Sequence, residues 1–336
     1  MTPTVTRWSK LLIGILATLL FSWMFLQHLD WSIGVTVLTD ASFPHLIMAI
    51  GLLGLGYVLR IVRWWIMLRS LSPGLTVAAC AGPLLSGMAL NNILPFRAGD
   101  VIRAFGFRQQ LKLLPSQVLI TIVIERVFDL AALLIAFFFG LWGIGSHAFP
   151  VGVIQAVYLL TISSMIVLLL CVCLSAKIER WARRLADAAS RRGANVVGYV
   201  GMVAAQIFSD LTLMRSPLLV LQLFGLSLGV WLFEGAMFAA VAHAIGLSGA
   251  GFGPWLAMAT GTLSTLIPST PGYVGTFDFF TMLGLTMYNV PEQLAAIFAV
   301  AVHVMLWLPV TLVGLVWLCV LKLGTRRVER PMEMLS

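Results

Sequence analysis

Six ionisable side chains lie inside or beside long apolar stretches of this sequence. They are Glu125, Arg126, Asp129, Glu234, Asp278 and His303. A charged side chain at the centre of a bilayer costs about 2.5–3.5 kcal/mol on insertion scales, so it is normally paired or hydrated. We therefore treat all six as candidate substrate-binding residues. The chemistry open to them is proton binding on a transport path or structural ion pairing.

Glu125 and Asp129 lie one helical turn apart on one face, and Arg126 stands three residues before Asp129, a spacing that allows an ion pair. These three side chains could simply hold helices in register as a salt-bridge cluster. Glu234 differs because it has no charged neighbour in sequence. It needs a distant partner, a protonated state or a functional role.

Polar residues also surround Pro95 and Gly99, a helix-breaking pair in the segment LNNILPFRAGDVIRAF at residues 90–105. The polar members are Asn91, Asn92, Arg97, Asp100 and Arg103. The two asparagines could satisfy backbone groups freed by Pro95 or contact a substrate, and the sequence does not choose between these roles. The two arginines suit bidentate binding of a phosphate, although arginines that only anchor the topology would look the same.

A second segment, LSTLIPSTPGYVGTFD at residues 263–278, repeats this pattern 173 positions later, so that Pro95 aligns with Pro268 and Gly99 with Gly272. Duplicated breaks inside apolar segments are typical of transporters built from repeats with discontinuous helices. We therefore expect two re-entrant helical hairpins; the alternative is that the prolines only kink ordinary helices. The residues expected at the breaks are Pro95, Gly99, Pro268, Pro271 and Gly272, with Thr270 as a further candidate for substrate binding.

The elements that must position these residues are membrane helices, because 60% of the 336 residues are apolar and only 10% are charged. The sequence predicts an all-α integral membrane protein with about six full transmembrane helices and the two re-entrant hairpins, in a single polytopic domain over residues 1–336. The full spans are expected at about 11–27, 43–66, 117–144, 151–175, 217–245 and 293–321, and the interrupted segments at about 77–107 and 254–289.

The basic residues predict the orientation of these spans. If both termini are cytoplasmic, no Lys or Arg is left in an outer loop, as the positive-inside rule requires. The predicted units are repeat 1 at about 43–144, a cytoplasmic amphipathic segment at 176–214, and an inverted repeat 2 at about 217–321. The first apolar run lacks a small-residue cleavage site, so we expect a retained span rather than a signal peptide.

Charge and cysteine usage narrow the class further. The formal charge is +8, and the basic residues behind it are distributed as the positive-inside rule requires of a membrane protein. We therefore expect no nucleic-acid partner. The four cysteines, Cys80, Cys171, Cys173 and Cys319, have no metal-ligand spacing and are expected to be packing residues. We expect no metal and no cofactor, and the lack of a Gly-x-x-x-x-Gly-Lys-Ser/Thr motif argues against direct ATP hydrolysis.

Three segments, NNILPFRAGDVIRAF, IERVFD and PSTPGYVGTFDFF, resemble in this order the motifs of the membrane region of lysylphosphatidylglycerol synthases. The same motifs occur in stand-alone relatives that include proteins associated with hopanoid biosynthesis. The resemblance runs from about residue 10 to about residue 325. It implies a lipid flippase-like domain in a bacterial inner membrane. It also implies functional roles for Arg97, Asp100, Arg103, Glu125, Arg126, Asp129 and Asp278.

The chain departs from the family pattern at three places. Relatives often carry Glu where this chain has Asp100 and Asp278, and Gly where it has Tyr273, so headgroup choice stays open. We expect no aminoacyl-transferase domain in this sequence, so lysyl transfer by this chain alone is not expected.

Three functions fit these observations, and we expect a transporter rather than an enzyme. The first is a lipid translocase that loads an anionic or modified lipid at a cationic cytoplasmic opening formed by Arg97 and Arg103. The second is a membrane-embedded transferase acting on a lipid-linked substrate, in which Glu125 and Asp129 would hold Mg²⁺ through a phosphate. The third is an ion-coupled transporter of a small polar solute. A membrane lipid is the expected partner; a second copy of the chain and lipid-biosynthesis enzymes are further candidates.

Overall fold

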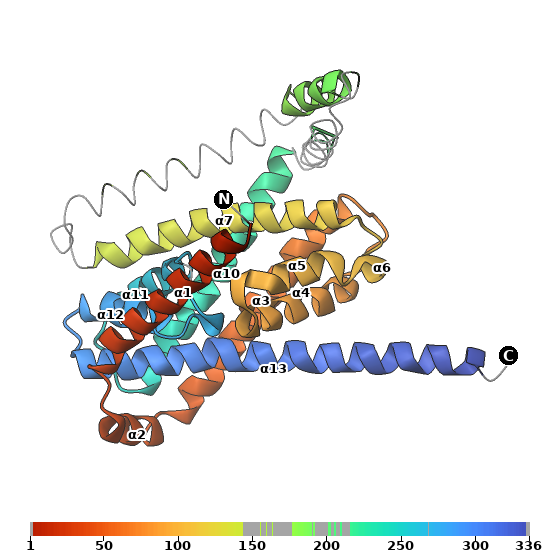
Figure 1. Cartoon of the computed structure of the whole chain (residues 1–336). Helices are drawn as coiled ribbons and strands as arrows, with labels where there is room; N and C mark the ends of the chain where they lie inside the picture. The colour runs from red at the N-terminus through yellow and green to blue at the C-terminus, as the bar shows by residue number, and fades with distance from the viewer. Residues whose placement is uncertain are drawn as a thin grey trace.

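The computed structural model describes residues 3–143, 177–189, 216–267 and 269–333, together with isolated positions between 144 and 215. All regular structure in these residues is helical, which confirms the all-α class. The helices are α1 (Pro3–Leu26), α2 (Trp31–Thr39), α3 (Phe43–Arg69), α4 (Val77–Ile93), α5 (Ala98–Phe105), α6 (Arg108–Leu111), α7 (Pro115–Trp142), α10 (Pro217–Ala244), α11 (Gly253–Ser264), α12 (Thr276–Thr286) and α13 (Glu292–Glu333), with 3-10 turns η1 (Pro95–Arg97) and η2 (Pro271–Tyr273) (Figure 1).

Long apolar helices identify an integral membrane protein. Helices α3 and α10 and residues 292–320 of α13 are each long and apolar enough to cross a bilayer. Helix α7 has the same length as α10, 28 residues, but carries three charged side chains near its middle. The expected spans at 43–66, 117–144, 217–245 and 293–321 correspond to these four helices.

The expected span at 11–27 falls on α1, in which residues 14–26 form an apolar stretch shorter than those of α3, α10 and α13. Two further segments and one unexpected helix remain. The expected span at 151–175 lies outside the described residues, as does most of the segment at 176–214, of which residues 177–189 are helical. Helix α2 is not expected from the apolar pattern. It begins at Trp31 because the Asp30 carboxylate accepts hydrogen bonds from the N–H groups of Ser32 (2.9 Å) and Ile33 (3.4 Å).

Both interrupted segments are broken helices. In the first, α4 ends at Ile93, Pro95 opens η1, and α5 packs back against α4. In the second, α11 ends at Ser264, Pro271 opens η2, and α12 packs back against α11. Pro268, which aligns with Pro95 by sequence, lies outside the described residues. The residue that occupies the place of Pro95 in the second break is therefore Pro271.

The two halves of the chain contain matching elements in the same order. Helices α3, α4, α5 and α7 correspond to α10, α11, α12 and α13. Their contacts are reciprocal, because α4 packs on α13 while α11 packs on α7, and α3 packs along α10. Figure 1 shows α4 and α5 toward one end of the body and α11 and α12 toward the other. Copies related by a two-fold axis make such reciprocal contacts. The pattern supports the interpretation as two repeats, and their inversion in the membrane stays a prediction.

Gly99 determines how closely the first hairpin closes. A Cβ atom at this position would meet the carbonyl oxygen of Gly87 and the backbone of Asn91. Glycine alone permits two backbones to approach so closely. This closure brings Asp100 and Arg103 of α5 against α7, where both form ion pairs.

The interior consists of two hydrophobic clusters that meet. One surrounds the second hairpin and includes Phe238 and Phe298, whose rings lie 6.0 Å apart. The other surrounds the first hairpin and includes Trp64 and Phe128. Met88 packs against both clusters, so the hydrophobic interior is continuous from one hairpin to the other.

Candidate functional site

A cluster of ionised side chains lies between α3, α5, α7 and α10. In the described part of the chain it contains four arginines and four carboxylates, so its formal charge is zero. The members are Arg60, Arg63, Asp100, Arg103, Glu125, Arg126, Asp129 and Glu234. We call this set the charge cluster.

Glu234 has its partner on another helix. Arg60 of α3 donates to Glu234 Oε2 at 2.5 Å and lies 4.0 Å from Asp129. The Arg60 guanidinium also lies over the ring of Trp231, 5.1 Å from its centroid. A cation flanked by carboxylates and an aromatic face is compensated for the loss of water. Of the three possibilities left open by the sequence, the structure therefore supports a distant partner for Glu234.

Arg63 is the most highly connected arginine of the charge cluster. Its guanidinium donates to both carboxylate oxygens of Asp129, at 2.5 and 3.2 Å, and to the Ser227 hydroxyl at 2.6 Å. It also lies 3.6 Å from Glu125. Such two-pronged contact with a carboxylate requires the planar fork of arginine. Arg63 thereby ties α3 to α7 and α10.

Arg103 does not face an opening in this structure. Its guanidinium donates to Glu125 Oε2 at 2.7 Å, lies 4.3 Å from the centroid of a Trp64 ring, and has no exposed side-chain surface. Its part in phosphate binding is therefore not supported by this arrangement. Arg103 instead fixes the returning helix α5 to α7.

Arg126 is the accessible arginine of the charge cluster, with 33% of its side chain exposed. It lies 3.5 Å from Asp100, 3.7 Å from Glu125 and 4.0 Å from Asp129, and the last contact has the spacing expected from sequence. Asp100 in turn accepts a hydrogen bond from the side-chain amide of Asn91 at 3.0 Å. Asn91 also accepts one from the Asp100 backbone N–H at 3.0 Å. Asn91 thus caps α5, which is the structural one of its two expected roles.

Two members of the charge cluster, Arg60 and Arg63, were not among the candidate residues identified from the sequence. Both are buried in the charge cluster. The sequence does indicate that these two arginines act together, because their i, i+3 spacing places them on one face of α3. The sequence gives no distance between helices, however, and so cannot pair that face with the carboxylates of α7 and α10.

A second polar site lies where the two breaks meet. Arg97, the last residue of η1, donates from Nε to the Tyr273 hydroxyl at 3.0 Å and from Nη2 to the Thr265 hydroxyl at 3.1 Å. These residues line a cavity of about 260 Å³ together with Asn91, Leu94, Pro95, Ile267, Ser269, Thr270, Pro271 and Gly272. We call this space the polar cavity. It brings together residues of both breaks, among them the sequence candidates Arg97, Thr270, Pro271 and Gly272.

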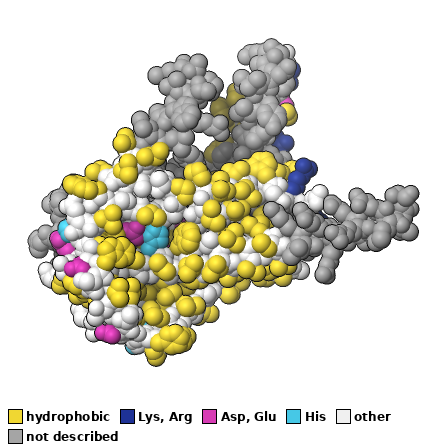
Figure 2. Space-filling model, turned by 60° about the horizontal axis from the view of Figure 1, so that its bottom comes forward, with side chains coloured by type: hydrophobic (Ala, Val, Ile, Leu, Met, Phe, Trp, Pro, Cys, Tyr) yellow, Lys and Arg dark blue, Asp and Glu magenta, His cyan; other side chains and the backbone are white. Residues whose placement is uncertain are grey.

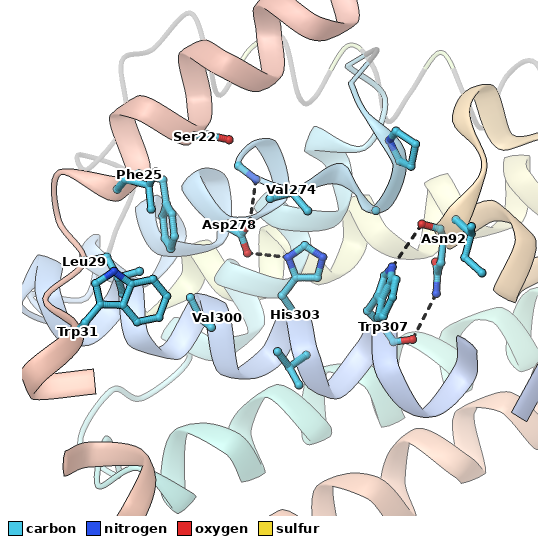
Figure 3. A pocket seen from close by; sticks show the side chains of 16 residues that line it. Ser22, Phe25, Leu29, Trp31, Asn92, Val274, Asp278, Val300, His303 and Trp307 are labelled. Carbon is cyan, nitrogen blue, oxygen red and sulfur yellow. Dashed lines mark hydrogen bonds and ion pairs between the residues drawn. The ribbon is translucent and has the colours of Figure 1, made fainter. Parts of the chain in front are cut away.

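Thr270 and Asn92 are held by helices outside the breaks. The Thr270 backbone N–H donates to the Thr18 hydroxyl of α1 at 3.0 Å. The Asn92 amide donates to the Thr311 hydroxyl of α13 at 2.9 Å. The Asn92 carbonyl accepts from the Trp307 indole at 3.3 Å (Figure 3). Both breaks are therefore anchored at their tips rather than free.

A larger and mainly apolar cavity of about 630 Å³ adjoins the second break. Figure 3 shows Phe25, Leu29 and Trp31 on one side of it and Val300, His303 and Trp307 of α13 on another. We call this space the apolar cavity. Figure 2 shows a molecular face on which hydrophobic side chains predominate, with a histidine and an acidic side chain among them.

Asp278 and His303 form the polar pair of the apolar cavity. Asp278 Oδ1 lies 2.7 Å from His303 Nδ1, and Asp278 Oδ2 accepts a hydrogen bond from the Gly275 backbone N–H at 2.8 Å (Figure 3). The structure thus brings together these two candidates from sequence. It also separates them from the charge cluster, to which Glu234 belongs.

The two cavities are neighbours, because Pro271 and Gly272 line both. The polar cavity offers the Arg97 guanidinium and hydroxyl groups, and the apolar cavity offers a long apolar wall. Within the described residues, no group of three or more His, Cys, Asp or Glu side chains is arranged to hold a metal ion.

Comparison with known proteins agrees with the motifs. Glycosyltransferase AglD of Haloferax volcanii is 27% identical over 333 residues, which cover 90% of this chain and 53% of the relative. The chain thus spans about half the length of that relative. No solved structure matches it. The family model of the lysylphosphatidylglycerol synthase TM region matches residues 11–314, and the chain belongs to this family.

Proposed function

We propose that the protein is a lipid translocase that moves an anionic lipid between the leaflets of its membrane. The observation that carries this proposal is the contact between the polar cavity and the apolar cavity at the second break. A lipid needs both environments at once, one for its headgroup and one for its chains. A small polar solute has no apolar part that would occupy the apolar cavity.

Arg97 is suited to an anionic headgroup because hydroxyl groups, not carboxylates, hold it. Its hydrogen-bond partners among the described residues are Tyr273 and Thr265, both neutral. Each arginine of the charge cluster, by contrast, already has a carboxylate within 4.0 Å. A phosphate can therefore replace two hydroxyls at Arg97 without breaking an ion pair, and it gains a charge-assisted contact.

The apolar cavity is suited to a lipid chain. Its volume of about 630 Å³ falls within the usual range of about 300–1,000 Å³ for ligand sites, and few polar groups interrupt its walls. Helix α1 contributes Phe25 and Leu26, and α13 contributes Val300 and Val304. An acyl chain of the lipid lying in this cavity would stay in contact with apolar surface while the headgroup passes the breaks.

The breaks themselves fit this path. Irregular backbone is tolerated at membrane depth where it lines a cavity or is buried in protein. Both 3-10 turns line the polar cavity through Pro95 and Arg97 in one case and Pro271 and Tyr273 in the other. Both breaks therefore border the space that a headgroup would cross.

The test is lipid movement in proteoliposomes made with purified protein. Fluorescent phosphatidylglycerol and fluorescent phosphatidylcholine, each bleached from the outer side, would report transport of an anionic and a zwitterionic lipid. Wild-type protein should move phosphatidylglycerol faster. Arg97→Ala should slow that movement by about tenfold or more, and Arg97→Lys should slow it less, since the charge remains but the fork is lost.

Arg69→Ala is the matched control. Arg69 lies at the end of α3, over the Trp65 ring at 4.7 Å, and lines neither cavity. It should transport like wild type. Equal transport of both lipids by wild type, or wild-type rates for Arg97→Ala, would remove Arg97 as the headgroup site.

A further inference from the structure

The apolar cavity contains one place where charge can change. Of the side chains that line it, only Asp278 and His303 are titratable; no Lys, Arg, Glu, Tyr or Cys is present. Imidazole is the side chain that most readily gains or loses a proton near neutral pH. Ionisable residues at membrane depth also mark proton relays in transporters.

The contacts of the pair leave one atom for the proton. Both oxygens of Asp278 are engaged, one by His303 Nδ1 at 2.7 Å and one by the Gly275 N–H at 2.8 Å. The edge of Phe277 packs on the imidazole with ring centroids 5.0 Å apart. In the described part of the chain, no hydrogen bond reaches His303 Nε2, and 16% of the side chain is exposed. Asp278 therefore orients the ring through Nδ1 and leaves Nε2 without a hydrogen-bond partner among the described residues.

Among the described residues, no oppositely charged side chain pairs with Asp278 and His303. Helices α1 over residues 14–26 and α2 carry no ionisable side chain, and α4 carries only Cys80, near its other end. Ionisable groups on the elements around the pair have partners of their own. Tyr273 and Arg97 are bonded to each other, and Glu234 of α10 pairs with Arg60. Glu292, at the start of α13 itself, pairs with His28 at 2.8 Å, and Asp30 accepts hydrogen bonds from Ser32 and Ile33 of α2. The charge of the cavity therefore follows the proton on His303.

We propose that Asp278 and His303 form a proton-binding site that couples proton movement to lipid movement. This inference rests on the proposed lipid transport. One proton adds to His303 Nε2 and converts the pair from a carboxylate with neutral imidazole, net −1, to a carboxylate with imidazolium, net zero. No other bond is made or broken.

The coupling follows from the sign of the two charges. With the pair at −1, an anionic headgroup passing the second break meets a like charge in an apolar wall, where such repulsion is poorly screened. With the pair neutral, that repulsion is absent and the protonated Nε2 donates a hydrogen bond. Proton and anionic lipid therefore favour each other's binding, and by thermodynamic reciprocity they do so by the same factor. The two cross the membrane in the same direction.

Asp278 also links the proton to the shape of the break. It accepts from the N–H of Gly275, the residue before α12, and Gly272, Tyr273 and Gly275 all have positive φ values, of 73°, 57° and 79°. Glycine adopts this conformation readily, but for Tyr273 it is sparsely populated and persists where other contacts hold it. Protonation of His303 strengthens its interaction with the Asp278 carboxylate, and the same carboxylate holds this turn. A change of charge at Asp278 and His303 would therefore also act on the conformation of the second break.

The experiment uses proteoliposomes that contain fluorescent phosphatidylglycerol and a trapped pH-sensitive dye. For wild type, lipid movement should be accompanied by proton movement in the same direction, and a pH gradient of two units should change its rate by about tenfold. His303→Gln should abolish both the proton signal and the effect of the gradient. His243→Gln is the matched control, because His243 stacks on His45 away from both cavities and should behave as wild type.

Lipid binding in detergent provides a second measurement that does not depend on His303→Gln folding. Phosphatidylglycerol should bind wild type about tenfold more tightly at about pH 5.5 than at about pH 8. At about pH 8, Asp278→Asn should bind it more tightly than wild type does, because the pair then lacks its negative charge.

The outcomes separate the two proposals. Wild-type lipid movement that ignores the gradient and carries no protons overturns the coupling and leaves the translocase standing. Opposed proton and lipid movement overturns the shared direction, and with it the charge argument. No lipid movement by wild type under any gradient overturns both proposals.

Discussion

The guanidinium of Arg97 donates a hydrogen bond of 3.0 Å to the hydroxyl of Tyr273, and the two residues hold equivalent places in two different breaks. Each is the third residue of its 3-10 turn, and each has a left-handed backbone, with φ of 53° and 57°. The described chain has two other non-glycine residues with positive φ, Lys112 and Asn289. They too hold equivalent places, shortly before α7 in one half and shortly before α13 in the other. Matching strained positions in both halves are expected if each half derives from one ancestral unit.

Removing the Tyr273 hydroxyl should loosen the junction between the breaks. Tyr273→Phe should lower the free energy of unfolding by about 1 kcal/mol, because one hydrogen bond is lost while Arg97 keeps Thr265. Thermal unfolding in detergent would measure this. A double-mutant cycle with Arg97→Ala should give a coupling of about 0.5–3 kcal/mol. Strictly additive effects would mean that the two side chains do not interact in solution.

The charge cluster should depend on complete pairing. Glu234→Ala leaves Arg60 buried beside a single, more distant carboxylate at 4.0 Å, and it should destabilise the protein by about 3–5 kcal/mol. Glu292→Ala is the control, since its pair with His28 is 63% exposed on the Glu292 side and should contribute less than about 1 kcal/mol. Similar unfolding temperatures for both variants would contradict a buried ion pair at Glu234.

The first hairpin should not tolerate a side chain at its closest approach. Gly99→Ala would place Cβ against the Gly87 carbonyl, which is backbone and cannot rotate away, so we expect a loss of at least about 1–3 kcal/mol. Gly54→Ala is the matched control because nothing lies within 4 Å of the added atom. It should be neutral or slightly stabilising, since alanine is the better helix former. Comparable stability of the two variants would show that α5 does not close onto α4 as described.

Site-directed labelling would test the orientation of the two hairpins. With Arg60 and Arg63 in the interior, Arg69 remains as the basic residue at the end of α3, and the positive-inside rule places the following loop in the cytoplasm. A Pro73→Cys variant should therefore react with a membrane-impermeant thiol reagent only after permeabilisation. Ser248→Cys, in the exposed loop between α10 and α11, should react in intact cells. The same accessibility for both positions would exclude inverted repeats.

Local chemistry explains what could be predicted along the chain. The breaks were recognisable because Pro95, Pro271 and Gly272 act on their own backbone, whatever surrounds them. The long helices were recognisable because a bilayer demands long apolar runs. The pair Arg126 and Asp129 was recognisable because helix geometry fixes its spacing.

The helical membrane class, the two broken segments and the positions of the intramembrane charges could be read along the chain, because each depends on neighbouring residues or on composition. Tertiary structure alone decided which charges meet: Arg60 with Glu234, Arg63 with Asp129, Asp278 with His303, and Arg97 with a tyrosine rather than a carboxylate. Ion pairing depends on a few ångströms between side chains of different helices. A periodic sequence specifies which face a residue occupies, and only packing determines what that face meets.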